Sequence, residues 1–239
     1  MMNLVLDIGN TAAKWALFEG RTLVESGVWD AECGKVEKWN GVERAMLCAS
    51  GDITAWKECL DSIGIQPVTL NHKTPLPIGI DYKTPETLGA DRVAAACGAW
   101  GLHRGEPCLI VDAGTCITVD YLDAEGVYHG GAIMPGLKMS LRALNSFTAK
   151  LPLVDIDGVE RATVVGRSTE ESIVAGTLGA TMLALAGFVA LYKEKNPALH
   201  VLLTGGDAER LTLAGANGWE MVPTLTLSGL NEIMMYDEK

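Results

Sequence analysis

Two short segments, far apart in the chain, carry residue types that can hold phosphate groups. DIGNT (7–11) follows an apolar run at 4–6, and DAGT (112–115) follows another at 109–111. Glycine in a tight turn lets backbone N–H groups approach an anion, and Asn and Thr side chains add neutral donors. One such segment alone is equally compatible with a β-turn that bonds its own backbone. Because the design occurs twice, we predict two turns that hold one polyphosphate from opposite sides.

The carboxylates in these turns need a separate explanation, because they repel phosphate. Asp7 is explained if it holds Mg²⁺ through water, since Mg²⁺ keeps most of its waters and binds few protein carboxylates. Asp112 is a second candidate cation ligand, and Thr115 is a candidate phosphate donor. Lys14 can supply positive charge near the first turn. The pattern favours a nucleotide polyphosphate with its metal.

The segment GADR (89–92) follows Tyr82 and begins an alanine-rich stretch. A surface salt bridge at a helix start is one explanation of its Asp–Arg pair. In a phosphoryl-transfer site, Asp91 would instead accept the proton of a substrate hydroxyl, and Arg92 would bond a carboxylate or polar head group. Such catalysis is mostly positioning and charge neutralisation, so one base and a metal suffice.

Two glycine-rich segments lie where strands are expected to meet helices. GGAIMPG (130–136) permits close approach of its backbone to a ligand, although a simple strand-to-helix connection explains it as well. TGGD (204–207) follows the apolar run HVLL, so its glycines end a strand just before a helix. Phosphate or ribose groups often rest on helix-terminal N–H groups at such positions.

Composition excludes several other classes of function. The net charge of −11 argues against nonspecific nucleic-acid binding and against an anionic membrane surface. We expect no signal peptide, and no segment with the roughly 18 uninterrupted apolar residues of a membrane span, so the chain is expected to be cytoplasmic. The cysteines form no CxxC pair, and we interpret Cys97 and Cys108 as reduced core residues. The four histidines lie far apart in unlike contexts, and we assign none a catalytic role.

The expected elements alternate strands with helices, which indicates an α/β fold. Each phosphate turn opens three consecutive strand-like segments, for which an antiparallel meander is the simplest arrangement. Later strands are expected at 44–50 and 200–206. Helices are expected at 53–63, 86–101, 136–147 and 170–195, with Thr84 as a possible N-cap before Pro85. We predict two similar lobes, 1–104 and 105–239, with ligand chemistry in a cleft between them.

The paired turns resemble those of the ASKHA superfamily of acetate and sugar kinases, Hsp70 and actin. Within it, the chain is similar to the type III pantothenate kinases along essentially its whole length. The motifs that carry this resemblance, in order, are DIGNTAAK (7–14), IDY (80–82), GADR (89–92), DAGTCITVD (112–120), GGAIMPG (130–136), TEESI (169–173) and TGGD (204–207).

The resemblance implies ATP-dependent phosphorylation of pantothenate, the first step of coenzyme A biosynthesis, by a homodimer of two-lobed chains. It also implies Mg²⁺ and a monovalent cation, K⁺ or NH₄⁺. Asp91 would be the general base and Asp112 would bind the monovalent cation. The residues implied to contact ATP are Asp7, Ile8, Gly9, Asn10, Thr11, Ala12, Ala13, Lys14 and Thr115. Those implied to contact pantothenate are Tyr82, Gly89, Ala90, Asp91, Arg92 and Thr169, the last possibly across the dimer interface.

Two other hypotheses remain open at this point. Another ASKHA phosphotransferase, acting on a sugar or on polyphosphate, would carry the same ATP turns, although GADR and Tyr82 weigh against it. A nucleotide-binding regulator without catalysis would bind ATP with no acceptor-dependent turnover. The apolar stretch 173–192 is a candidate dimer face, and it is equally compatible with a core helix.

Overall fold

The computed structural model describes residues 1–9, 12–29, 39, 41–51, 53–62, 64–159 and 163–236. The chain forms two compact units. Unit 1 consists of Met1–Gly105, Leu122–Gly130 and Thr224–Lys239, and unit 2 consists of Glu106–Tyr121 and Gly131–Pro223. The lobe boundary expected between residues 104 and 105 stays a prediction; the last helix, α7, lies with unit 1.

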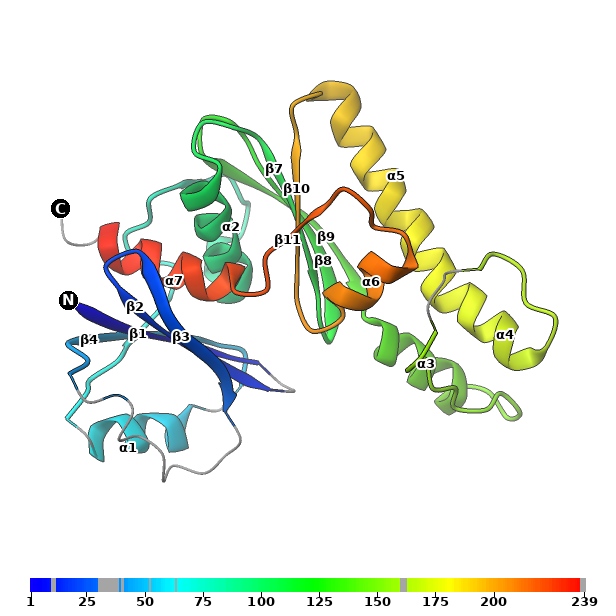
Figure 1. The fold of residues 1–239 in the computed structure, drawn as a ribbon, viewed down its shortest axis with the longest axis horizontal. Coiled ribbons are helices and arrows are strands. Elements are labelled where there is room, and N and C mark those ends of the chain that lie inside the picture. Colours follow the sequence, from blue (N-terminus) through cyan, green and yellow to red (C-terminus); the bar gives the residue numbers. More distant parts are fainter. Residues whose placement is uncertain are drawn as a thin grey trace. The chain divides into compact units, whose positions relative to one another are not determined.

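The elements follow one another as β1 (Met2–Ile8), β2 (Ala13–Glu19), β3 (Thr22–Trp29), β4 (Arg44–Ala49), α1 (Thr54–Ser62), β5 (Val68–Thr69), β6 (Gly79–Ile80), the 3₁₀ helix η2 (Pro85–Thr87), α2 (Ala90–Leu102), β7 (Cys108–Ala113), β8 (Cys116–Leu122), β9 (Val127–Pro135), α3 (Leu137–Ser146), α4 (Thr169–Val174), the π-helical segment η3 (Ala175–Gly179), α5 (Ala180–Lys195), β10 (His200–Thr204), α6 (Ala208–Ala214), β11 (Glu220–Met221) and α7 (Leu225–Tyr236) (Figure 1).

The first sheet has the strand order β3-β2-β1-β4-β5. Strands β1, β2 and β3 form the expected antiparallel meander, and the register sets Asp7 opposite Lys14. Strand β4 lies parallel to β1 on its other side and brings Cys48 beside Asp7. Both faces of β1 are covered, one by the core cluster that joins Leu4 and Leu6 to Leu60 and the other by α7, which explains its nearly continuous apolar sequence.

The second sheet repeats this arrangement, in the order β11-β10-β7-β8-β9-β6. Short connections join β7, β8 and β9, and such connections allow only antiparallel neighbours. Strand β10 lies parallel to β7, and β11 lies parallel to β10. The order β9-β8-β7-β10-β11 therefore matches β3-β2-β1-β4-β5, with α6 in the place of α1. The α/β fold and the internal repeat expected from the two turns are confirmed.

The start of α2 differs from its expected position at residue 86. The chain forms the short helix η2 first, and then Leu88 and Gly89 are extended before α2 begins at Ala90. Thr84 occupies the expected N-cap position before Pro85, but it precedes η2 and not α2, and its side chain makes no cap bond. Its carbonyl and hydroxyl oxygens instead accept hydrogen bonds from the Thr87 hydroxyl at 3.0 and 2.9 Å.

The expected helix 170–195 is present, but a π-helical turn interrupts it at η3. Within the residues that the structure describes, the stretch Thr169–Lys195 is long and apolar enough to cross a membrane, by length and composition alone. The expectation that no segment reaches this limit is therefore wrong. In the most apolar window of this stretch, 44% of the residues are buried, and core helices of globular proteins pass the same test.

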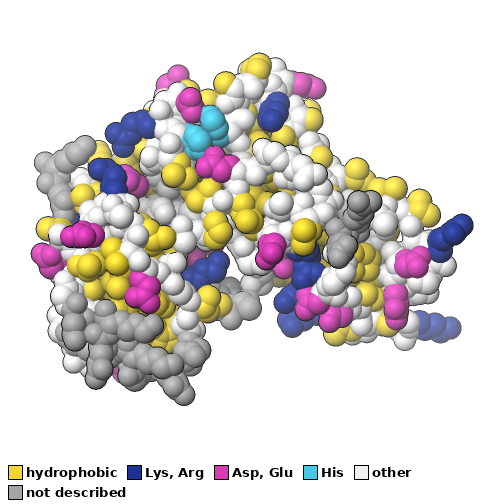
Figure 2. All heavy atoms as spheres, viewed as in Figure 1, with side chains coloured by type: hydrophobic (Ala, Val, Ile, Leu, Met, Phe, Trp, Pro, Cys, Tyr) yellow, Lys and Arg dark blue, Asp and Glu magenta, His cyan; other side chains and the backbone are white. Residues whose placement is uncertain are grey.

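Figure 2 shows hydrophobic side chains among scattered charged ones on the visible surface.

The interpretation of Cys97 and Cys108 as reduced core residues is confirmed. Cys97 and Cys108 are free and buried, and burial raises the pKa of the Cys108 thiol to about 12. Cys48 and Cys116 are also free. Cys59, in contrast, is disulfide-bonded.

Helices α2 and α7 cross in direct backbone contact within unit 1, where they lie side by side in Figure 1. A Cβ atom added to Gly229 would lie 1.7 Å from the carbonyl oxygen of Ala94. A Cβ on Gly98 would lie 2.3 Å from the carbonyl oxygen of Leu225. Only glycine permits this approach, because backbone atoms on the opposite helix cannot move aside.

A buried polar bridge ties α7 to the first sheet. The Asn3 side-chain amide donates to the side-chain oxygen of Asn231 at 2.8 Å, and the amide of Asn231 donates to the Gly20 carbonyl at 2.9 Å. Both asparagines are almost fully buried. Since a buried polar group without a partner is costly, the bridge specifies how α7 lies on β1 and β2.

We predict that Gly229→Ala destabilises the protein by about 2–3 kcal/mol, because overpacking a close contact forces the backbones apart. The measurement is urea denaturation followed by circular dichroism. Gly101→Ala is the matched control on α2, since its Cβ would meet the movable side chain of Glu232. It should change stability by less than about 1 kcal/mol, because alanine also favours the helix. Equal stability of the two variants would contradict the backbone contact.

Candidate phosphoryl-transfer site

The first turn joins β1 to β2 and begins at a carboxylate in the sheet. Asp7 is half-buried at the end of β1, and the Gly9 N–H donates to the Ala12 carbonyl at 3.1 Å. Lys14 lies opposite Asp7 on β2, and the Cys48 thiol donates to Asp7 Oδ1 at 3.3 Å. The expected residues Asn10 and Thr11 lie outside the described residues.

The Asp7 carboxylate lies in an unfavourable field for a negative charge. Burial raises its pKa, and the Asp91 carboxylate raises it further, while the Cys48 hydrogen bond and the Lys14 charge lower it. A net increase means that the ionised form lacks full compensation. A bound cation would supply that compensation, so the residues present fit a metal at this position.

The second carboxylate, Asp91, comes from the first turn of α2. Its Oδ1 accepts a hydrogen bond from the Arg92 N–H at 2.9 Å. Gly89 precedes it, and a Cβ at that residue would lie 2.5 Å from Asp91 Oδ1. Gly89 therefore leaves the space that the carboxylate occupies. A negative side chain is favourable in the first helical turn, where the backbone N–H groups point outward.

Arg92 and two tyrosines form the wall next to this carboxylate. Arg92 is 8% exposed, and its Cζ lies 5.9 Å from the Tyr82 ring centroid and 6.0 Å from that of Tyr128. Tyr82 also packs against Gly130, where a Cβ would lie 2.9 Å from its ring. A guanidinium held against aromatic faces keeps its orientation, which suits recognition of a carboxylate or polar head group.

The second turn lies in unit 2, between β7 and β8. Asp112 is half-buried near the end of β7, and Thr115 is exposed. The Gly114 N–H donates to the Cys116 carbonyl at 2.9 Å, which closes a tight turn. The Asp207 N–H donates to the Ala113 carbonyl at 2.8 Å.

The two glycine-rich segments pack against this second turn. A Cβ on Gly136 would lie 2.3 Å from the Gly114 carbonyl oxygen. Gly205, with φ +97°, would place a Cβ 2.5 Å from Asp112 Oδ1. Gly136 of GGAIMPG and Gly205 of TGGD thus pack against DAGT within unit 2.

Thr169 lies in another part of unit 2, at the exposed start of α4. The Ser168 hydroxyl caps this helix by accepting from the Glu171 N–H at 3.1 Å, and Glu171 accepts from the Arg167 N–H at 2.6 Å. Thr169 lines a hollow of about 760 Å³, together with Leu144, Leu151, Gly166, Arg167, Ser168, Ser172, Ile173 and Gly176.

Sequence reasoning missed two neighbours of the site, Cys48 and Tyr128. Each lies in an apolar run that was interpreted as a strand, and only the pairing of the strands brings it beside a site residue.

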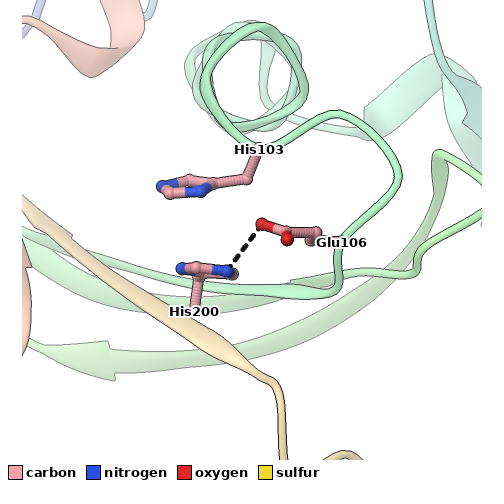
Figure 3. A group of neighbouring side chains, drawn as sticks. All are labelled: His103, Glu106 and His200. Atoms are coloured by element: carbon pink, nitrogen blue, oxygen red, sulfur yellow. Dashed lines mark ion pairs between the residues drawn. The ribbon is translucent and has the colours of Figure 1, made fainter.

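Figure 3 shows another polar pair, Glu106 Oε2 and His200 Nε2, 2.7 Å apart. That pair lies at the beginning of β7 and β10, at the opposite end of these strands from Asp112.

The comparisons with known proteins identify a family. The family model for type III pantothenate kinases matches residues 48–191. A type III pantothenate kinase of Bacteroides fragilis is 40% identical over 249 residues, which cover 99% of this chain and 98% of the relative.

Two solved structures share the fold at low sequence identity. A Campylobacter jejuni protein assigned to the Baf family of transcriptional activators has a TM-score of 0.61 at 19% identity and covers 98% of both chains. The activator of 2-hydroxyisocaproyl-CoA dehydratase from Clostridium difficile has a TM-score of 0.55 at 16% identity and covers 100% of this chain and 95% of its own.

Together with the repeated sheets, these likenesses identify the fold as the actin-like ASKHA fold. The family match spans more than half of the chain, and the curated relative covers nearly all of it. The chain therefore belongs to the type III pantothenate kinases, the family that phosphorylates pantothenate in coenzyme A biosynthesis.

Proposed function

We propose that this chain transfers the γ-phosphoryl group of ATP to the hydroxyl of pantothenate and forms 4′-phosphopantothenate. The observation that carries the proposal is the position of Asp91. Its carboxylate lies at the start of α2, in the field of Asp7 and next to Arg92. A base, a candidate metal ligand and a cation for the acceptor thus come together within unit 1.

In the proposed reaction, Asp91 accepts the proton of the pantothenate hydroxyl as the hydroxyl oxygen bonds to the γ-phosphorus. The bond between the γ-phosphorus and the bridging oxygen breaks, and ADP leaves. Arg92 and Tyr82 hold the acceptor, with Gly89 and Ala90 beside it. Most of the rate comes from this positioning and from neutralised phosphate charge.

Cations are assigned to the two turn carboxylates. Asp7 would hold Mg²⁺, which supplies charge neutralisation at the phosphates when it is bound. Asp112 would hold the monovalent cation, K⁺ or NH₄⁺, in unit 2. A half-buried carboxylate oxygen suits such hard cations.

ATP is assigned to the backbone and side chains of both turns. In the first turn these are the described residues Ile8, Gly9, Ala12, Ala13 and Lys14, while the roles of Asn10 and Thr11 stay predictions. Thr115 would contact the phosphates from the second turn. Glycines pack closely around DAGT, and a glycine places no side chain next to the turn, which supports this assignment.

We also propose that the chain is a cytoplasmic homodimer and that Thr169 contacts pantothenate across the interface. The α5 face supports the dimer, since Leu183 and Leu191 are 62% and 61% exposed there. Gly187 lies between them on the helix, and nothing lies within 4 Å of its added Cβ. Exposed leucines around a small residue allow two helices to approach closely.

Cell fractionation checks the proposed cytoplasmic location, and recovery of the protein with membranes would contradict that location.

We predict that Asp91→Asn lowers kcat by at least about 100-fold, because the variant has no base for the hydroxyl proton. The assay measures ADP release with ATP, Mg²⁺ and K⁺, with and without pantothenate. Asp61→Asn is the control, an exposed carboxylate on α1. Full activity of Asp91→Asn, or ADP release that does not depend on pantothenate, would overturn the proposed function.

Gly89→Ala tests the same carboxylate without removing it. Alanine tolerates the Gly89 backbone angles of −57° and 128°, so the fold should keep its stability. The new Cβ must displace the Asp91 carboxylate, and kcat should fall by up to about 100-fold. Unchanged kcat would show that the position of this carboxylate does not matter.

For the monovalent cation, we predict that turnover of the wild-type enzyme rises with added KCl at constant ionic strength. Asp112→Asn should raise the K⁺ concentration for half-activation by about tenfold or more, because it removes a charged ligand. Tetramethylammonium chloride keeps the ionic strength constant. Activity without K⁺, or the same K⁺ requirement in the variant, rules out Asp112 as the ligand.

For the dimer, we predict that the wild-type protein elutes with about twice the 25.4 kDa mass of one chain in light-scattering chromatography. The double variant Leu183→Glu with Leu191→Glu should elute as a monomer, because it places charges in an apolar interface. Leu213→Glu, on α6, is the control because that leucine is 60% exposed. A dimer that survives the double substitution excludes this face.

A further inference from the structure

His129 bridges two carboxylates in unit 1, from different parts of the chain. Its Nδ1 lies 3.2 Å from Asp81 Oδ2, and its Nε2 lies 2.6 Å from Asp123 Oδ2. Asp81 follows β6, Asp123 lies in the turn before β9, and His129 is on β9. The sequence assigned no role to this histidine, and the proposed reaction does not use it.

The bridge holds the segment that leads to Tyr82. Strand β6 has only two residues, and it pairs with β9 through Gly79–Val127 and Ile80–Tyr128. The Asp81 N–H adds one more bond, to the Tyr128 carbonyl at 2.9 Å. Such a short strand is weakly held by its backbone alone. The Asp81 side chain, which is 77% exposed, adds the contact to His129 to these backbone bonds.

The two neighbours of His129 on β9 contact Tyr82 directly. The Tyr128 ring lies 6.2 Å from the Tyr82 ring, centroid to centroid. On the other side, Gly130 has no side chain and receives the Tyr82 ring. A movement of Asp81 away from His129 would thus shift Tyr82 against both Tyr128 and Gly130, and with it the surface next to Arg92.

We propose that protonated His129 clamps Asp81 to β9 and so positions Tyr82 for the acceptor, which makes His129 a positioning residue for pantothenate binding. The inference rests on the proposed function, because it takes Tyr82 as part of the acceptor site. It adds a determinant outside the residues that contact the substrate.

The charged neighbours of His129 decide the pH range of the clamp. The hydrogen bond to Asp123 raises the pKa of His129, burial lowers it, and Asp81 raises it again, with a net increase. Burial raises the pKa of Asp123, but His129 and the Val127 N–H outweigh this effect and lower it. From α2, Arg92 faces the two tyrosine rings. The imidazolium is thus present below the raised pKa of His129 and is lost as the pH rises through it.

The test measures KM for pantothenate between pH 6 and 9 at saturating ATP. In the wild-type enzyme, KM should rise by about threefold toward high pH, the size expected for a partly exposed ion pair. In His129→Gln and in Asp81→Asn, KM should be raised at low pH and should lack this step, while kcat at each pH changes little. The double variant should show no further increase in KM.

His72→Gln is the control, since His72 lies exposed in a turn before β6. It should keep the wild-type profile, and thermal melting checks that each variant is folded. A wild-type KM profile in His129→Gln would overturn the clamp while leaving pantothenate kinase activity intact. Absence of pantothenate-dependent turnover in the wild type would instead overturn the proposed function.

A second measurement needs no substrate. In NMR spectra of the wild-type protein, the Tyr82 ring signals should shift with pH at the same midpoint as the His129 Cε1 proton. Neither His129→Gln nor Asp81→Asn should show this shift of Tyr82. If the wild-type Tyr82 signals do not shift as His129 titrates, the clamp is wrong. This conclusion does not depend on which substrate the enzyme phosphorylates.

Discussion

The backbone contact between α2 and α7 is the constraint on which the acceptor side of the site depends. Gly98 and Gly229 let the two helices approach with no side chain between them. Helix α2 carries Asp91 and Arg92 in its first turn, so the crossing fixes the direction from which the Asp91 carboxylate points. The buried Asn3–Asn231 bridge fixes α7 on the first sheet in turn. The position of the Asp91 carboxylate, the proposed base, thus depends on contacts far from it in sequence.

The electrostatics of unit 1 follow from that placement. Asp91 lies near enough to Asp7 to oppose its ionisation, and burial opposes it as well. The negative charges of Asp7 and Asp91 repel each other, and the same two charges attract a cation. Cys48 and Lys14 offset part of the repulsion but not all of it. These surroundings of Asp7 therefore suit the cation proposed there.

Much of this could be predicted from the sequence, because local patterns determine it. The turns at Asp7 and Asp112 follow apolar runs and contain glycine, and their repetition predicted the matching sheets. The start of α2 was missed because Leu88 and Gly89 are extended, which propensity alone does not reveal. The Cys48 thiol, Tyr128 and the His129 bridge were missed because each depends on strand pairing. Pairing between distant strands is a tertiary property, so no local pattern encodes it.

The repeated topology gives the two turn carboxylates the same scaffold and different surroundings. Asp7 has Cys48 beside it on the parallel strand β4, and Asp112 has Thr204 in the same place on β10. Lys14 lies opposite Asp7 across a connection of residues 9–12, whereas only residues 114 and 115 separate β7 from β8. Cys48 and Lys14 thus offset part of the cost of ionising Asp7, while the missing Cβ of Gly205 leaves room for the Asp112 carboxylate. The repeated topology explains why each carboxylate lies near the end of a central strand, and the different neighbours support the proposal that the two carboxylates bind different cations.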